Sequence, residues 1–89
     1  MTKMNDQVSN PLRAMIVEDE ILIAEDLKER LVRFGFRVIA AVDTAEEGIA
    51  IATQEVPDLI LMDIRLKGKK DGIQAVEEIR KQVDLQSYI

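Results

Sequence analysis

The sequence predicts an α/β fold in which the strands of a parallel sheet alternate with helices. Three short, mostly apolar runs are separated by longer segments whose apolar residues recur at helical spacing. Runs this apolar are typical of strands buried on both faces, and strict alternation with helices implies right-handed crossover connections. Two of the runs end in acid, with Glu18 and Asp19 after the first and Asp63 closing the third. The predicted strands cover residues 13–19, 36–42 and 58–63.

The first helix is predicted to follow the first strand directly, over residues 20–34. Gly35 comes next, and glycine is the residue that most often ends a helix because it adopts the left-handed conformation without steric cost. The second strand is rich in β-branched and aromatic residues and carries Arg37 as its only charge. The expected inner face of the first helix consists of Ile23, Leu27, Leu31 and Phe34.

Polar residues mark the starts of the second and third helices. Thr44 and Glu47 form a capping-box pattern, in which the Thr44 hydroxyl accepts from a first-turn amide and Glu47 reaches back to the Thr44 N–H. Pro57 precedes the third strand, where its missing N–H costs little. After a loop over residues 65–72, Asp71 is the predicted N-cap of the third helix. The expected inner faces are Ala45, Ile49, Ala52 and Val56 for the second helix and Ile73, Val76, Ile79 and Val83 for the third.

The two ends of the chain carry no strong structural pattern. Residues 1–12 are polar and are predicted to form a flexible tail, and residues 84–89 predict no element. The segment between the tail and the end, residues 13–89, is expected to hold one domain. The predicted core is Ile16, Val17, Ile23, Leu27, Leu31, Val38, Ile49, Ala52, Ile60, Leu61, Ile73, Val76 and Ile79.

Composition excludes several kinds of site. The chain has 89 residues and neither cysteine nor histidine, which excludes a disulfide framework, a thiolate or imidazole metal site and a Ser-His-Asp arrangement. Its formal net charge of -5 argues against a broad nucleic-acid interface. No apolar stretch is long enough to span a membrane, and the first residues lack a signal-peptide pattern. We therefore expect a soluble cytoplasmic domain with no nucleic-acid or membrane partner.

The carboxylates at the strand ends predict a cation site. In open α/β sheets, reactive groups gather beyond the carboxyl ends of the strands, so Glu18, Asp19 and Asp63 are expected to converge if their strands are neighbours. Crowded carboxylates repel one another unless a cation joins them, and oxygen ligands alone suit Mg²⁺. A lone aspartate would more often mark a solvated strand end. The acidic pair on a second strand favours the metal site, and a Mg²⁺ site suits a phosphoryl reactant.

Other phosphate-handling sites do not fit the sequence. Neither acidic strand end is followed by a glycine-rich phosphate loop or by the glycine pattern of dinucleotide-binding folds. A flavin-phosphate site requires hydroxyls and glycines after the first strand, where this chain has acids. A phosphatase that uses two aspartates two residues apart is disfavoured, because Arg65 stands where the second aspartate would be.

Three stretches of the chain together resemble a known family. They are Met15-Ile16-Val17-Glu18-Asp19-Glu20, Pro57-Asp58-Leu59-Ile60-Leu61-Met62-Asp63-Ile64 and Lys70-Asp71-Gly72. In this combination the chain is similar to the receiver domain of two-component response regulators, over Arg13 to about Val83. The resemblance implies a partial flavodoxin-like fold, with a three-stranded parallel sheet of order 2-1-3 and three helices.

The same resemblance implies a function and its residues. Asp63 would accept a phosphoryl group from the histidine of a sensor kinase, forming an aspartyl phosphate in a two-component phosphorelay. Mg²⁺ would be held by Glu18, Asp19, Asp63 and the backbone carbonyl of Arg65. The chain would then be a signalling module and not an enzyme.

Several positions differ from the common receiver pattern. The first acid is Glu18, where many relatives have aspartate, and the loop before Asp71 lacks a proline near Lys67 and has one residue more. Receivers also use a Ser or Thr from a fourth strand and a Lys from a fifth, and Ser87 is not expected to fill the first role. The chain is therefore expected to be the N-terminal portion of a receiver domain, truncated after the third helix.

Two functional interpretations stay open besides a small Mg²⁺-dependent phosphatase. The first is a phosphoacceptor module, and the second is a non-catalytic fragment that associates with itself or is completed by a partner. The third strand is expected to leave one edge unpaired, since a three-stranded sheet of this order places it at the side. Such an edge, or exchange of the third helix, predicts a homodimer or a domain-swapped assembly.

Overall fold

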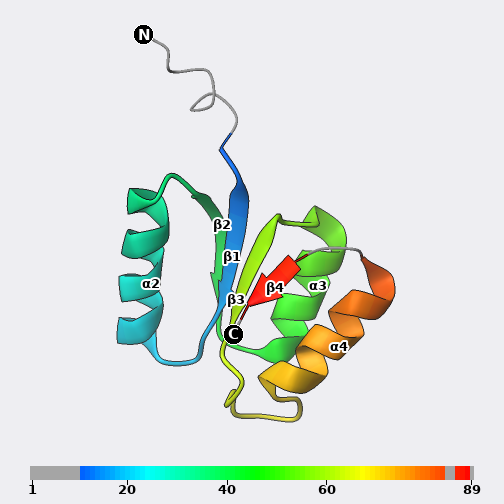
Figure 1. The fold of residues 1–89 in the computed structure, drawn as a ribbon. Coiled ribbons are helices and arrows are strands. Elements are labelled where there is room, and N and C mark those ends of the chain that lie inside the picture. Colours follow the sequence, from blue (N-terminus) through cyan, green and yellow to red (C-terminus); the bar gives the residue numbers. More distant parts are fainter. Residues whose placement is uncertain (1–10, 84–85, 89) are drawn as a thin grey trace, which may run out of the picture.

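The computed structural model describes residues 11–83 and 86–88. Their elements are β1 (Arg13–Val17), α2 (Ile21–Arg33), β2 (Arg37–Val42), α3 (Ala45–Glu55), β3 (Leu59–Met62), α4 (Gly72–Gln82) and β4 (Gln86–Tyr88). The sheet order is β2-β1-β3-β4, which confirms the predicted parallel order 2-1-3 of the first three strands. The helix α2 covers one face of the sheet, and α3 and α4 cover the other (Figure 1). Ten of the twelve residues predicted to form a tail lie outside the described residues.

β1 is the central strand, and its register with β3 brings the acidic ends together. Val17 is paired with Met62 in the parallel ladder, and the Asp63 N–H donates to the Val17 carbonyl at 3.0 Å. Glu18 and Asp63 therefore leave neighbouring strands at the same level. Each strand ends before its acid, so the carboxylates stand just beyond the sheet rather than within it.

The predicted open edge of the third strand is wrong for the residues that the structure describes. β4 pairs in parallel with β3, and the register matches Leu59 with Gln86 and Leu61 with Tyr88. The sequence pattern missed this strand because Gln-Ser-Tyr has neither an apolar run nor an alternation. Backbone N–H and C=O groups pair regardless of side chain, so a three-residue segment of this kind can still complete a ladder.

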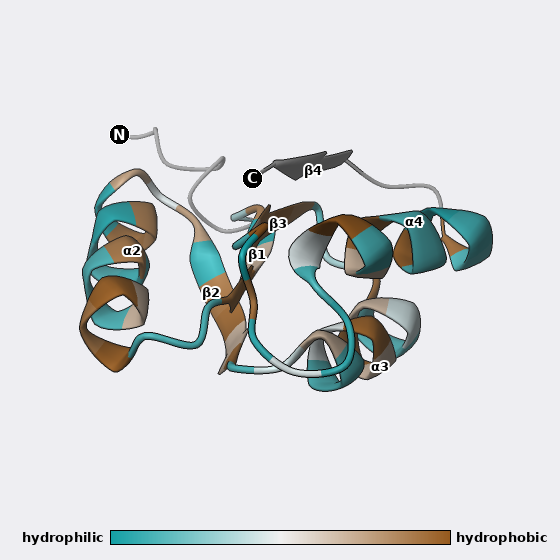
Figure 2. Cartoon of the chain, turned by 90° about the horizontal axis from the view of Figure 1, so that it is seen from below, coloured by the Kyte–Doolittle hydropathy of each residue, from teal (hydrophilic) through white to brown (hydrophobic). Residues whose placement is uncertain are grey.

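The larger core lies on the face covered by α3 and α4, which Figure 2 shows on the side of the sheet away from α2. Its buried members are Met15, Val17, Ala45, Ala52, Ile60, Met62, Leu66, Ala75 and Ile79. The face under α2 is smaller, with Ala14, Ile16 and Leu31 buried and with Leu27, Phe36, Val38, Leu59 and Leu61 partly covered. No helix in the described part of the chain combines the length and the apolar character needed to cross a bilayer.

Four predicted inner-face residues turn outward. Ile23 on α2 is 44 % exposed, Phe34, the C-cap that follows α2, is 79 % exposed, and Ile73 on α4 is 52 % exposed. Helical periodicity correctly predicts which side of each helix is apolar. The ends of that apolar side extend beyond the sheet, so the residues there are not covered. Val56 is 45 % exposed and lies outside α3, because it is the C-cap in a left-handed conformation with φ 45°.

The helix ends follow the predicted residues with one change. Gly35 has φ 94°, and the Phe36 N–H bonds the Leu31 carbonyl at 2.9 Å, as in a Schellman motif. The Thr44 hydroxyl accepts from a helix amide as expected, but the Glu47 carboxylate meets that hydroxyl at 3.4 Å instead of the Thr44 N–H. The reciprocal capping box is found at the start of α4, where Asp71 is the N-cap and Gln74 the partner.

Candidate metal centre

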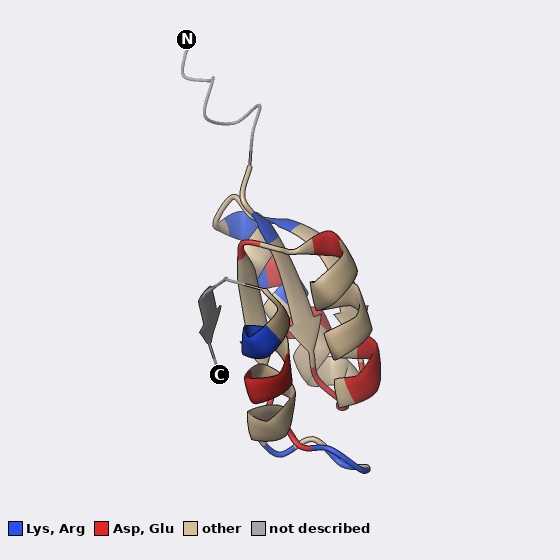
Figure 3. Cartoon of the chain, turned by 90° about the vertical axis from the view of Figure 1, so that its right-hand side faces the viewer, with Lys and Arg blue, Asp and Glu red and all other residues tan. Residues whose placement is uncertain are grey.

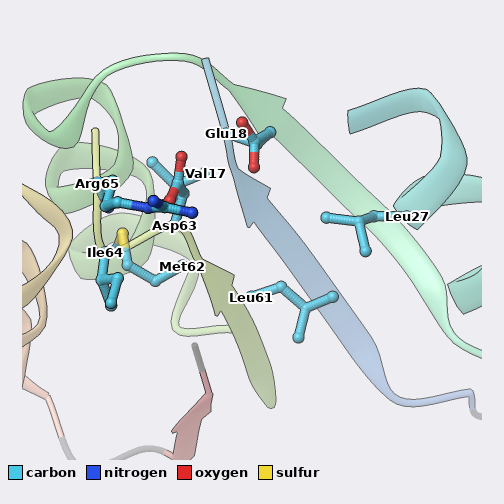
Figure 4. A pocket seen from close by; sticks show the side chains of 8 residues that line it. All are labelled: Val17, Glu18, Leu27, Leu61, Met62, Asp63, Ile64 and Arg65. Carbon is cyan, nitrogen blue, oxygen red and sulfur yellow. The ribbon is translucent and has the colours of Figure 1, made fainter. Parts of the chain in front are cut away.

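The fold brings the three predicted carboxylates into one cluster. Glu18, Asp19 and Asp63 each offer an oxygen atom, and these atoms lie within 4.8 Å of one another. Glu18 follows β1 and Asp63 follows β3 (Figure 4), and Asp19 is the next residue after Glu18. Among the residues that the structure describes, none of the three takes part in an ion pair. A cluster of like charges without a neutralising side chain fits a hard cation with oxygen ligands.

Each carboxylate is held by one backbone N–H. The Glu20 N–H donates to Glu18 Oε2 at 3.0 Å, and the Arg65 N–H donates to Asp63 Oδ1 at 2.9 Å. The Lys67 N–H reaches Asp19 Oδ2 at 3.3 Å. These bonds orient the side chains and leave Glu18 Oε1, Asp19 Oδ1 and Asp63 Oδ2 without such a backbone partner, so the cluster keeps acceptor capacity for a ligand.

Glu18 is the most enclosed of the three acids. It is 9 % exposed, and burial raises its pKa above the ordinary value, because the charged form loses hydration. The hydrogen bond from Glu20 opposes that rise, while the negative charges of Asp63 and Asp19 add to it. Ionising the Glu18 carboxyl group in the folded protein therefore costs more free energy than ionising an exposed glutamate. A cation bound beside it would lower that cost.

Two residues position the acceptor loop without touching a ligand. A Cβ placed on Gly72 would lie 2.1 Å from the Asp63 carbonyl oxygen and 2.7 Å from Ile64 Cα, so only glycine lets α4 begin this close to Asp63. Leu66, 6 % exposed, anchors the loop in the larger core. Gly72 belongs to one of the motifs singled out in the sequence, but a single sequence does not measure such a close approach.

A pocket opens beside the cluster. It has a volume of about 560 Å³, and its lining includes the apolar side chains of Leu27, Leu61 and Ile64 together with the acids Glu18 and Asp63. Figure 4 shows Leu27 reaching in from α2 and Leu61 from β3. Arg65 also lines the pocket, and its backbone carbonyl as a metal ligand stays a prediction.

The loop between β3 and α4 is basic. Lys67, Lys69 and Lys70 follow Arg65 within a few residues, and the blue loop next to red acidic positions is visible in Figure 3. Lys70 pairs with Glu78 on α4 at 3.1 Å. The rest of this charge faces solvent close to the acids, where it can attract an anionic reactant.

Ser87 does not lie at the carboxyl end of its strand. Its register partner is Ile60, three residues before Asp63, which places it on the order of 10 Å back along the sheet. That Ser87 does not fill the role of the family's Ser or Thr stays a prediction, although the segment around it is a strand.

The chain is similar to known proteins over most of its length. Residues 14–89 match the family described as "Response regulator receiver domain". The transcriptional regulatory protein PdtaR of Mycobacterium tuberculosis is 38% identical over 69 residues, covering 78% of this chain and 33% of that protein. The chemotaxis protein CheY of Bacillus subtilis is 36% identical over 77 residues, covering 86% of this chain and 62% of that protein.

Solved structures lead to the same family. A signal receiver domain of a modulated diguanylate cyclase from Desulfovibrio desulfuricans has a TM-score of 0.81 at 32% identity, covering 89% of this chain and 63% of that one. The anti-anti-sigma factor PhyR of Bartonella quintana, in complex with the anti-sigma factor NepR, has a TM-score of 0.80 at 33% identity, covering 89% and 33%. The chain thus spans about a third of the length of the first of these curated relatives.

Proposed function

This chain belongs to the response regulator receiver family, and on that premise we propose that it is a phosphoacceptor signalling module of a two-component phosphorelay. Asp63 accepts the phosphoryl group, and the donor is the phosphohistidine of a sensor kinase or phosphotransfer protein. The observation that carries the proposal is the cluster of Glu18, Asp19 and Asp63 within 4.8 Å, beside a basic loop and an open pocket.

The reaction is a transfer between two nucleophiles. An Asp63 carboxylate oxygen attacks phosphorus, the O–P bond forms as the N–P bond breaks, and the departing imidazole of the donor takes up a proton. The Arg65 N–H holds Asp63 Oδ1, which leaves Oδ2 as the attacking atom. The product is an acyl phosphate on Asp63.

The acid cluster fits the cation that this family generally binds. Glu18, Asp19 and Asp63, with the Arg65 carbonyl, would hold Mg²⁺, and the ion when bound neutralises charge on the transferring phosphoryl oxygens. The residues of the chain supply the rest. Gly72 and the Arg65 N–H keep Asp63 at the end of β3, and the lysines of the loop raise the local concentration of an anionic donor.

We propose that these residues make up the amino-terminal portion of a receiver. The match to the solved receiver domain covers 63% of that domain, which supports this reading, and Ser87 lies too far back to sense the phosphoryl group. The Ser/Thr and Lys that complete the switch in the family have no counterpart among the described residues. In this proposal, Asp63 can accept a phosphoryl group without the Ser/Thr and Lys that respond to it in the family.

The test uses a small phosphodonor, acetyl phosphate, with and without Mg²⁺. The protein should gain the mass of one phosphoryl group only with Mg²⁺, and borohydride trapping followed by peptide mapping should locate it at Asp63. Asp63→Asn should abolish the modification, while Asp58→Asn, an aspartate at the other end of β3, should not. Modification elsewhere, or of Asp63→Asn to the same extent, would contradict the proposal.

The alternative is a non-catalytic fragment that associates with itself or is completed by another polypeptide. Ile73 on α4 is 52 % exposed, and the pocket beside Leu27 and Leu61 is partly apolar, so α4 exchange or docking of a partner into that pocket would cover apolar surface. PhyR forms a complex with a protein partner. In this case, acetyl phosphate would leave the chain unmodified in the experiment above.

A further inference from the structure

The side chain of Arg65 is the charged group beside the acid cluster that has no partner in the fold. Arg65 is the second residue after Asp63, and it is exposed. Within the described ranges, its guanidinium takes part in no ion pair. Among the described residues that line the pocket beside Glu18 and Asp63, it is the one cation. The proposed function uses only the backbone of this residue.

The loop geometry starts this side chain next to the acceptor. The Arg65 N–H donates to Asp63 Oδ1 at 2.9 Å, and the Arg65 Cα is one bond of about 1.46 Å beyond that nitrogen. The following residue, Leu66, is buried in the larger core and fixes the loop at this point. Figure 4 shows the Arg65 side chain extending from the loop so that its guanidinium lies beside Asp63. The guanidinium therefore shares the pocket with the acceptor carboxylate without pairing with it.

A phosphoryl group on Asp63 would add negative charge to a site that is already acidic. Such a group carries roughly two negative charges and three acceptor oxygens, and here it would stand beside Glu18 and Asp19. A guanidinium offers a planar fork of N–H donors that matches two phosphoryl oxygens at once. Because Arg65 has no ion pair to break in the described part of the chain, turning it toward the phosphoryl group costs little.

We propose that the Arg65 guanidinium binds the phosphoryl oxygens, both during transfer and in the acyl phosphate on Asp63. This inference rests on the proposed function. The Asp63 oxygen forms the O–P bond as the N–P bond of the donor breaks, and Arg65 only donates hydrogen bonds to the phosphoryl oxygens, with no covalent change of its own. Lys67 and Lys69 of the same loop are not among the residues that line the pocket, so their charge acts on the approach of the donor and not on the bound group.

The rate of phosphorylation by acetyl phosphate at saturating Mg²⁺ tests the proposal. Arg65→Gln keeps the backbone N–H and carbonyl of the loop and removes the guanidinium, so it should slow phosphorylation of Asp63 by about 10-fold, as expected for one charge-assisted contact. Arg65→Lys keeps the positive charge without the planar fork, and its rate should be only about 3-fold below that of the parent.

Two binding measurements separate the guanidinium from the loop backbone. Beryllofluoride mimics a phosphoryl group on a carboxylate, and fluorine NMR follows its binding without any transfer reaction. Its dissociation constant should rise by about 10-fold in Arg65→Gln, in parallel with the loss of rate. The Mg²⁺ response of thermal stability, measured without the mimic, should shift by less than about 2-fold, because the backbone carbonyl of residue 65 is retained.

Arg80→Gln is the matched control, the same charge change at an exposed position in the last turn of α4, and it should alter the rate by less than about 2-fold. Circular dichroism verifies folding, and Arg65→Lys against this control decides if Arg65→Gln does not fold. An Arg65→Gln variant that reacts like Arg80→Gln would overturn this proposal while the modified Asp63 upholds the proposed function. An Arg65→Lys variant as slow as Arg65→Gln, or an equal loss of Mg²⁺ binding in Arg65→Gln, would also overturn it. A parent that acetyl phosphate leaves unmodified would refute the proposed function itself and this proposal with it.

Discussion

The two ends of the parallel sheet handle charge in opposite ways. At the carboxyl ends of β1 and β3, Glu18, Asp19 and Asp63 gather as like charges, without an ion pair among the described residues. At the amino ends, opposite charges meet. Arg13 contacts two acids there, Asp58 through its backbone N–H at 2.8 Å and Glu55 through its guanidinium at 2.9 Å.

The amino end is also tied together through the backbone. Arg13 Nη1 donates to the Glu55 carbonyl at 2.8 Å, at the last turn of α3, and the Asp58 N–H donates to the Arg13 carbonyl at 2.9 Å. These groups are satisfied within the chain and need no ligand. At the carboxyl end, Glu18, Asp19 and Asp63 each accept one backbone N–H, but among the described residues no cationic side chain pairs with them. Charges that a fold neutralises contribute to its stability, whereas charges that it gathers and leaves together point to a ligand.

The largest expected effect is at the carboxyl end. Gly72→Ala forces a Cβ against the Asp63 carbonyl, at 2.1 Å in the unrelaxed structure. Because that neighbour is backbone, α4 or the acceptor loop must move, at a cost of about 1–3 kcal/mol in the free energy of unfolding. Urea denaturation measures the loss. Gly68→Ala is the comparison variant, because a Cβ there has open space and its cost comes only from the positive φ of Gly68. A Gly72→Ala variant as stable as the parent would mean that α4 does not start against Asp63.

The second effect tests the amino end. Asp58→Ala leaves the Arg13 N–H without its side-chain acceptor and should lower the free energy of unfolding by about 1 kcal/mol. Since no cation is involved, the loss should be the same with and without Mg²⁺. A loss that changes with Mg²⁺ would show that the two ends are coupled and would break the comparison between them.

Asp63→Asn should act in the reverse sense. Removing one of three crowded negative charges should raise the stability of the metal-free protein by roughly 0.5–1 kcal/mol. The parent should gain about 1.4 kcal/mol at a Mg²⁺ concentration ten times its dissociation constant, and Asp63→Asn should gain less. Thermal denaturation in a Mg²⁺ series, with Ca²⁺ and Na⁺ as controls, measures both. An unchanged Mg²⁺ response would show that Asp63 is not a ligand.

The smallest effect concerns pH at the carboxyl end. The pKa of Glu18 is raised in the folded state, chiefly by burial. Between the ordinary pKa of glutamate and this raised pKa, the folded protein therefore binds more protons than the unfolded chain. Its stability contribution is complete below the ordinary pKa of glutamate and is lost as pH rises through the folded pKa. Compared with Glu18→Gln, the metal-free parent should become progressively less stable as pH rises from the ordinary pKa of glutamate through the raised pKa of Glu18. A constant difference over this range would show that Glu18 is not desolvated.

The local features of the site could be read from the sequence. Two apolar runs ending in acid predicted two strands and, if these strands were neighbours, the convergence of Glu18, Asp19 and Asp63; the structure places one oxygen of each within 4.8 Å of the others. Helix starts at Thr44 and Asp71 were predicted because a capping side chain acts on amides two or three residues away. The acidic strand ends and the capping residues depend on residues close in the chain, whereas the meeting of Glu18 with Asp63 depends on the pairing of β1 with β3.

What the sequence by itself determined was the order of elements, the acidic strand ends and the capping residues, since each follows from side-chain type and short-range periodicity. Only the tertiary structure decided the pairing of β4 with β3, the outward position of Ile73, the close approach of Gly72 to Asp63 and the link between Arg13 and Asp58. The physical reason is that backbone pairing does not depend on side-chain type. Burial, in turn, depends on which neighbour packs against a helix face rather than on the face itself.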